Sequence, residues 1–212
     1  MTLYKKRERF GSLSLKVGMV FSKFGLSPNQ WTVITLIPAL AAVFFLIKED
    51  FLSAAGCFVI ASFLDMVDGS VARVTGRVTK FGAYLDTIID RYVEALIILG
   101  LLFVALPAVD IPYLPWKIPI TAWLFVYFFG GIMTTYSKAA AKEKNIFVDK
   151  ELRGGLLERA ERLLLLFVGI LLAYFDPWLL SVMVIILAVL ANVSAVQRMH
   201  IAYKESKRKR EM

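Results

Sequence analysis

The sequence predicts an all-α integral membrane protein with six transmembrane helices, preceded by an amphipathic helix in the membrane interface. The first observation is composition: the 212 residues are 58% hydrophobic and the mean hydropathy is +0.67, too apolar for a soluble domain of this size. The second observation is length, because most of the apolar runs are about 18 to 24 residues long. At 1.5 Å per residue, such runs cross a hydrocarbon core of roughly 30 Å.

Six apolar runs define the predicted spans. The first 24 residues mix Lys and Arg with apolar side chains and have no long apolar stretch, so they predict an interfacial helix rather than a cleaved signal peptide. The predicted domains are an interfacial helix and entry segment (1–30), a transmembrane domain (31–203) and a basic tail (204–212). The spans are expected near residues 31–48, 51–72, 83–106, 117–140, 160–175 and 177–200.

The basic residues predict the orientation in the cell membrane. If the N-terminus is cytoplasmic, the same side carries residues 1–30, 73–80, 138–162 and the tail from 198, with 6, 3, 7 and 6 Lys or Arg. The opposite loops carry only Lys48 and Lys117. By the positive-inside rule, both termini of this multi-pass protein are therefore cytoplasmic. The net charge of +8 follows from this topology and from anionic lipid headgroups, so no nucleic-acid partner is predicted.

Four carboxylates lie inside or beside the second and third apolar runs. Asp65 and Asp68 are three residues apart and Asp86 and Asp90 are four apart, so each pair projects from one face of its helix. Charged groups at membrane depth are costly and indicate function. Hard divalent ions prefer carboxylate oxygens, and a pair of them can clamp a phosphoryl displacement. The acids therefore predict a phosphoryl-transfer site with two Mg²⁺ ions, or Mn²⁺ as an alternative, towards the cytoplasmic side.

Glycines and an arginine lie at fixed offsets among these acids. Gly69 and Gly82 allow a helix or a ligand to approach the backbone, and Arg73 can bind a phosphate as a bidentate donor. The full spacing resembles the signature of the CDP-alcohol phosphatidyltransferase family at all eight fixed residues. It reads Asp65-x2-Asp68-Gly69-x2-Ala72-Arg73-x8-Gly82-x3-Asp86-x3-Asp90. The resemblance implies a homodimeric membrane enzyme that uses a CDP-linked donor and releases CMP.

The resemblance also implies roles for individual residues. Asp65, Asp68 and Asp86 would anchor the metals, while Asp90 would contribute to the second ion and act as general base on the acceptor hydroxyl. For Arg91 and Glu94, which follow Asp90, a partner role at the site and a structural ion pair both stay open. The positions that match nucleotide-binding or diphosphate-binding residues of the family are Asn29, Gln30, Trp31, Thr32, Gly69, Arg73 and Thr79.

Three cations at the ends of different spans suggest a second anion site. Lys138, Arg162 and Arg198 each abut a span, and together they predict a phosphorylated acceptor. The segments around them resemble the family branch that uses inositol 1-phosphate, in which the corresponding Lys and two Arg hold the acceptor phosphate. For each residue singly, the alternative is a positive-inside marker.

The predicted function is the transfer of the phosphatidyl or archaetidyl group of a CDP-activated lipid to a polyol phosphate, most simply inositol 1-phosphate, in phospholipid biosynthesis. Within the family, glycerol 3-phosphate or serine as acceptor and CDP-inositol as donor stay open. A membrane prenyltransferase is a distant alternative. Such an enzyme is expected to carry a second Asp-rich motif far along the chain, but Asp176 is the one aspartate in residues 163–212. A divalent-cation transporter is not expected to place Arg73 beside the ion path.

Overall fold

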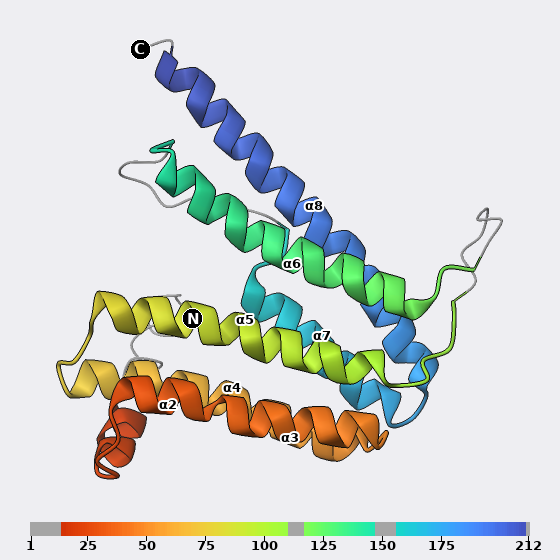
Figure 1. Ribbon diagram of the computed structural model, residues 1–212, viewed down its shortest axis with the longest axis horizontal. Helices are drawn as coiled ribbons and strands as arrows, with labels where there is room; N and C mark the ends of the chain where they lie inside the picture. The colour runs from red at the N-terminus through yellow and green to blue at the C-terminus, as the bar shows by residue number, and fades with distance from the viewer. Residues whose placement is uncertain (1–13, 110–116, 147–155, 211–212) are drawn as a thin grey trace, which may run out of the picture. The chain divides into compact units, whose positions relative to one another are not determined.

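The structure, a computed structural model, describes residues 14–109, 117–146 and 156–210, and every regular element in these ranges is an α-helix (Figure 1). The all-α prediction is therefore confirmed for the described residues. A helix over residues 14–22 comes first. The others are α2 (Pro28–Ile34), α3 (Leu36–Ile47), α4 (Phe51–Val74), α5 (Lys80–Leu102), α6 (Ile120–Glu143), α7 (Arg159–Ala173) and α8 (Pro177–Arg210).

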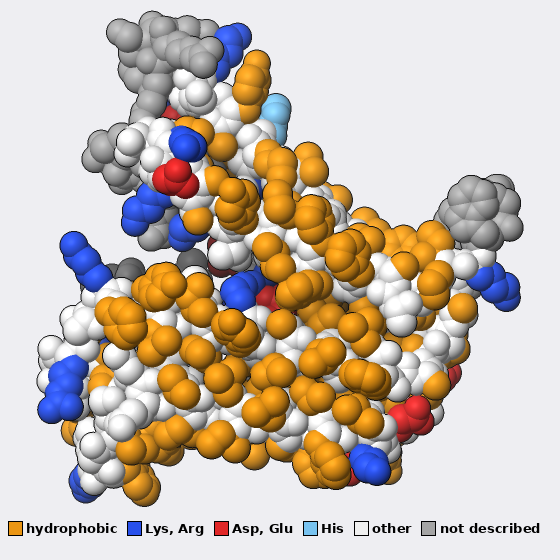
Figure 2. Space-filling model, viewed as in Figure 1, with side chains coloured by type: hydrophobic (Ala, Val, Ile, Leu, Met, Phe, Trp, Pro, Cys, Tyr) orange, Lys and Arg blue, Asp and Glu red, His pale blue; other side chains and the backbone are white. Residues whose placement is uncertain are grey.

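Four helical segments are long and apolar enough to cross a membrane: Pro28–Ile47, Phe51–Val74, Ile120–Glu143 and Pro177–Arg208. They agree with four of the six predicted spans. The other two predicted spans also form helices, but α5 carries several charged residues and α7 has only 15 residues. Large apolar side chains stay exposed along the helices, and hydrophobic side chains cover most of the visible face in Figure 2. The protein is a multi-pass membrane protein, because such apolar surfaces suit lipid rather than water.

Local sequence signals explain where the first spans begin and break. Ser27 caps α2 in a capping box: its hydroxyl accepts from the Gln30 backbone N–H at 3.3 Å, and its own N–H donates to Gln30 Oε1 at 2.8 Å. The first span divides at Thr35, because Pro38 has no N–H for the carbonyl four residues earlier. Asp50 caps α4, and hydrogen bonds from Ser53 hold the pKa of its carboxyl below the ordinary value.

The chain divides into two compact units, Met1–Gly100 and Leu101–Met212, which are considered separately. In the first unit, α2 and α3 pack against α4. Gly100 of α5 faces α3 so closely that a Cβ there would lie 2.8 Å from Leu46 Cδ1. Behind the entry to α2, Trp31, Val67 and Val71 form a buried apolar cluster. This packing holds α4, which carries the first half of the acidic motif, against α2 and α3.

In the second unit, α8 packs along both α6 and α7. Asn192 of α8 donates from Nδ2 to the carbonyl oxygen of Val126 at 2.9 Å, and a Cβ on Gly130 would lie 2.6 Å from the same nitrogen. Small residues and an interhelical hydrogen bond therefore hold these apolar helices together, as is usual where lipid removes the hydrophobic drive for helix association. The helix α8 continues through Arg210, into the predicted basic tail.

Candidate active site

The two acidic helices bring three carboxylates together. Asp65 of α4 and Asp86 and Asp90 of α5 are partly buried, and each offers an oxygen that lies within 4.8 Å of the other two. Like charges this close raise one another's energy unless a cation lies between them. An all-oxygen set of carboxylates is also the donor set that Mg²⁺ and Mn²⁺ prefer. The cluster therefore fits a divalent metal ion.

The fourth acid of the motif, Asp68, has a different environment. It is 5% exposed, and among the residues that the structure describes its Oδ2 has no hydrogen-bond partner. A buried carboxylate oxygen without a partner is costly, so a cation or a donor from a ligand would stabilise it. Asp68 lies outside the three-carboxylate cluster but shares a pocket wall with Asp86.

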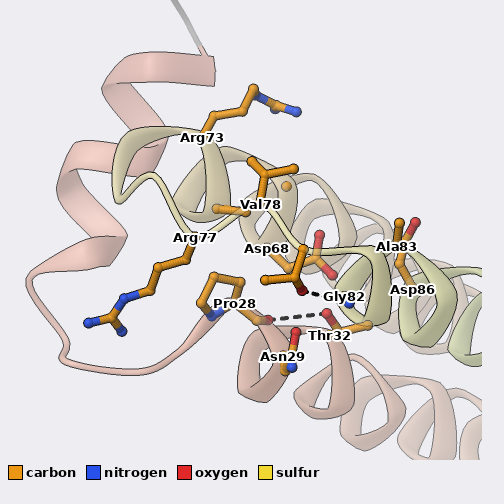
Figure 3. A pocket seen from close by; sticks show the side chains of 13 residues that line it. Pro28, Asn29, Thr32, Asp68, Arg73, Arg77, Val78, Gly82, Ala83 and Asp86 are labelled. Carbon is orange, nitrogen blue, oxygen red and sulfur yellow. Dashed lines mark hydrogen bonds between the residues drawn. The ribbon is translucent and has the colours of Figure 1, made fainter.

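That pocket has a volume of 370 Å³ and lies entirely in the first unit (Figure 3). Its walls come from the start of α2, the end of α4, the connecting loop and the start of α5. The lining residues are Pro28, Asn29 and Thr32; Asp68, Gly69, Ala72 and Arg73; Arg77, Val78 and Thr79; and Gly82, Ala83 and Asp86. The pocket is thus polar on the side of the acids and positively charged at the end of α4 and in the loop.

Gly82 allows the floor of the pocket to form. A Cβ at this position would lie 3.1 Å from Thr79 Oγ1 and 3.2 Å from Asn29 Oδ1. Thr79 directly precedes α5, and its hydroxyl accepts from the Gly82 backbone N–H at 2.9 Å. Two side-chain oxygens from different chain segments, those of Asn29 and Thr79, therefore meet over the bare backbone of Gly82.

Two of the four residues at 29–32 that were predicted to bind the nucleotide line the pocket, and two do not. Asn29 and Thr32 line the pocket, whereas Gln30 and Trp31 do not. The Gln30 side chain belongs to the capping box of α2. Trp31 is 7% exposed and packs edge-on against Phe21, with ring centroids 5.3 Å apart. The helical periodicity of α2 explains the division, because residues 29 and 32 share a face that 30 and 31 do not.

Arg73 reaches the pocket from the last turn of α4, and its contacts include residues that the sequence analysis missed. Its Nη2 donates to the hydroxyl of Ser14 at 2.8 Å and to that of Ser70 at 3.3 Å. Ser70 lies three residues before Arg73, so helical spacing could have indicated it. Ser14 is 59 residues away along the chain, and no local pattern points to it. Arg77 and Val78 of the pocket wall were also missed.

For Arg91 and Glu94 the sequence left open a partner role at the site and a structural ion pair. Arg91 Nη1 and Glu94 Oε2 form an ion pair at 2.6 Å, and Glu94 is 2% exposed. Both residues lie on α5 beyond Asp90, within the apolar part of the helix. The structural ion pair that the sequence allowed is therefore present.

The second unit brings two of the three predicted acceptor cations to one residue. Arg162 of α7 is 1% exposed and donates from Nη1 to the Thr134 hydroxyl at 3.3 Å. Arg198 of α8 donates from Nη1 to the Thr134 carbonyl oxygen at 2.7 Å. Lys138 lies one helical turn further along α6 and is exposed. Thr134, which no sequence motif marked, is thus the point where α6, α7 and α8 meet.

Comparison with known proteins places the chain among lipid-synthesising transferases. The family model described as CDP-alcohol phosphatidyltransferase matches residues 26–195. The archaetidylinositol phosphate synthase of Pyrococcus horikoshii is 29% identical over 189 residues, which cover 89% of this chain and 90% of that protein. A bifunctional IPC transferase and DIPP synthase of Aquifex aeolicus is 32% identical over 185 residues, but these cover only 39% of that longer protein.

Solved structures agree with this placement. Phosphatidylinositol phosphate synthase of Mycobacterium tuberculosis with CDP-DAG bound matches at a TM-score of 0.76 and 26% identity, over 91% of this chain and 94% of that one. The same protein in complex with manganese and citrate matches with the same TM-score and identity. These matches confirm the resemblance on which the sequence analysis relied.

Proposed function

Because the chain belongs to the CDP-alcohol phosphatidyltransferase family, we propose that it transfers the phosphatidyl or archaetidyl group of a CDP-linked lipid to inositol 1-phosphate and releases CMP. The observation that supports this acceptor is the convergence of Arg162 and Arg198 on Thr134. Two guanidinium groups that converge on one residue form a cationic site, and a phosphate accepts bidentate hydrogen bonds from Arg. Lys138, one turn away on α6, supplies a third charge.

The pocket of the first unit takes the CDP end of the donor. A volume of 370 Å³ is within the range of small-molecule sites, and its polar groups lie on three chain segments. Asn29 and Thr32 of α2 and Thr79 of the loop offer hydrogen bonds to the nucleoside. Arg73 binds the diphosphate as a planar donor, and the bare backbone of Gly69 beside it leaves room for the phosphate oxygens.

The acids hold the metals and one of them takes the proton. Asp65, Asp68, Asp86 and Asp90 would hold two Mg²⁺ or Mn²⁺ ions, which neutralise negative charge that develops on the diphosphate. Asp90 accepts the proton of the inositol hydroxyl as that oxygen bonds to the lipid-side phosphorus. The bond from this phosphorus to the bridging oxygen breaks, and CMP leaves with that oxygen. Arg73 stabilises the charge on the departing phosphate.

We propose for the protein the membrane topology that its sequence predicts. All six predicted spans cross the membrane, α5 and α7 included, since charges on α5 that serve a site need not face lipid. The described part of the N-terminal helix, residues 14–22, lies in the cytoplasmic interface, and its exposed apolar residues and Lys16 suit that position. The domain limits stay at 30 and 203, both termini and the site are cytoplasmic, and the enzyme works as a homodimer.

A donor and acceptor screen tests the proposed reaction. Purified protein with Mg²⁺ and radiolabelled CDP-diacylglycerol or CDP-archaeol is incubated with inositol 1-phosphate, glycerol 3-phosphate, serine or free inositol. CMP release that depends on inositol 1-phosphate is expected. Equal use of serine or free inositol would contradict the acceptor site. The screen also includes CDP-inositol as donor, the alternative donor that the sequence leaves open.

A further inference from the structure

The hydroxyl groups of Ser14 and Ser70 hold the Arg73 side chain through hydrogen bonds. Ser70 Oγ donates to the Met66 carbonyl oxygen at 2.8 Å. The two serine hydroxyls, of Ser14 and Ser70, lie 2.8 Å apart. Arg73 Nη2 then lies 2.8 Å from Ser14 Oγ and 3.3 Å from Ser70 Oγ. Arg73 also lines the pocket, and in Figure 3 its side chain lies on the opposite side of the end of α4 from Asn29 and Thr32.

These contacts link Arg73 to the backbone of α4 through two serine hydroxyls. Arg73 Nη2 donates to Ser14 and Ser70, because a guanidinium group is a donor only. Ser70 Oγ also lies within hydrogen-bond distance of the Met66 carbonyl oxygen, and either serine can donate across the 2.8 Å contact between the two hydroxyls. Both directions leave a lone pair on Ser14 Oγ to accept from Arg73.

Ser14 is delivered to this position by the docking of its helix. A Cβ on Gly18 would lie 2.5 Å from the Ser70 carbonyl oxygen and 2.7 Å from Val74 Cγ2, so the helix over residues 14–22 touches the backbone of α4. One turn further on, Phe21 packs edge-on against Trp31 at 5.3 Å and Phe63 at 5.7 Å. The Ser14 hydroxyl is therefore part of a packed interface between helices.

These contacts orient the donating edges of the guanidinium. Ser14 and Ser70 engage Nη2, and the guanidinium lies over Gly69, with Nη1 3.4 Å and Nη2 3.7 Å from the position that a Cβ there would occupy. Gly69 and Arg73 both line the pocket. Arginine has several rotatable bonds, and fixing them before the ligand arrives reduces the entropic cost of binding.

We propose that Ser14 is a positioning residue for the donor: it holds Nη2 of Arg73 so that the guanidinium lies over Gly69, where the CDP-lipid diphosphate binds. This inference rests on the proposed function, because it assumes that Arg73 binds the donor. It gives the N-terminal helix a part in donor binding in addition to any contact with the membrane surface. Ser14 itself touches no substrate.

The test compares three single variants of the full-length protein by steady-state kinetics in one detergent. In Ser14→Ala the KM for CDP-diacylglycerol should rise about two- to tenfold, the usual effect of losing one hydrogen bond, while the KM for inositol 1-phosphate stays unchanged. Ser14→Thr keeps the hydroxyl and should behave as wild type. Ser22→Ala is the matched control, because the Ser22 hydroxyl bonds only to the Met19 carbonyl oxygen of its own helix in the described residues.

A double-variant cycle separates this inference from the proposed function. If Ser14 acts through Arg73, adding Ser14→Ala to Arg73→Gln should not raise the donor KM further. An unchanged or lowered donor KM in Ser14→Ala, with a raised KM in Arg73→Gln, would overturn the positioning role alone. An unchanged donor KM in Arg73→Gln would overturn the donor role of Arg73 in the proposed function. An equal loss in Ser22→Ala would show that the helix responds to any serine removal and would overturn the specific role of Ser14.

Discussion

The Nη1 atom of the buried Arg162 side chain lies 3.3 Å from the hydroxyl of Thr134. Arg198 donates to the carbonyl oxygen of the same residue, so two helices present their guanidinium groups at one point of a third. Two guanidinium groups at one point match the bidentate hydrogen bonding of a phosphate. This relationship is the basis of the acceptor proposal.

The first prediction concerns these two arginines. Arg162→Gln and Arg198→Gln each remove a charge-assisted contact, so the KM for inositol 1-phosphate should rise about ten- to a hundredfold and the donor KM should stay nearly constant. Steady-state kinetics with each substrate varied in turn would measure both. Lys142→Gln is the matched control, since Lys142 is an exposed cation on α6. If the donor KM rises and the KM for inositol 1-phosphate does not, the arginines do not bind the acceptor and only mark the topology of the chain.

Asp90 can be tested as base separately from its role as ligand. Asp90→Asn keeps an oxygen that can touch a metal but cannot take a proton at neutral pH. Turnover should fall about 10²- to 10⁴-fold, the usual contribution of a general base, while CDP-lipid binding persists. Binding is followed by equilibrium dialysis of labelled donor. A variant that keeps more than about a tenth of wild-type kcat is incompatible with the base role.

Gly82 offers a test of the nucleotide pocket without removing any functional group. In Gly82→Ala the added methyl would press on Thr79 Oγ1 and Asn29 Oδ1, which lie 3.1 and 3.2 Å from its position. We expect a higher donor KM and an unchanged inositol 1-phosphate KM. Gly56→Ala is the control within α4, because no atom lies within 4 Å of its added Cβ. Equal effects of the two variants would count against the pocket as the donor site.

Metal binding by the acids can be measured without turnover. Asp65→Asn removes one carboxylate from the cluster with Asp86 and Asp90, so Mn²⁺ affinity measured by electron paramagnetic resonance should fall. Glu143→Gln, at an exposed acid paired with Lys144, should leave Mn²⁺ binding unchanged. If Asp65→Asn binds Mn²⁺ as wild type does, the cluster is not the metal site.

Patterns within one helix predicted much of this structure, because they depend only on helical geometry. The spacing of the two acid pairs predicted that four carboxylates face one another, and the structure brings Asp65, Asp86 and Asp90 together and leaves Asp68 outside the cluster. The capping box at the start of α2 is local in the same way, because Ser27 and Gln30 are three residues apart. The break at Thr35 also has a local cause, since Pro38 follows it. It was not predicted, because the continuous apolar run over 31–48 indicated one uninterrupted helix.

Contacts between distant segments could not be predicted in this way. Nothing in the sequence near Ser14 indicates that it meets Arg73, because that contact depends on how closely Gly18 lets its helix approach α4. Thr134 was missed for the same reason, since its neighbours come from α7 and α8. For Gln30, the family resemblance indicated a nucleotide contact, whereas the structure uses its side chain in a cap.

The proposed enzyme transfers the phosphatidyl or archaetidyl group to intact inositol 1-phosphate, so the phosphate of the acceptor enters the lipid product. The most direct measurement supplies inositol 1-[³²P]phosphate and unlabelled CDP-lipid with Mg²⁺, and follows both CMP release and the label in the organic phase. We expect label to enter the lipid fraction in equal amount to the CMP released, and Arg198→Gln to lower both at limiting acceptor. Release of CMP with all of the label left in the aqueous phase would contradict the proposed reaction.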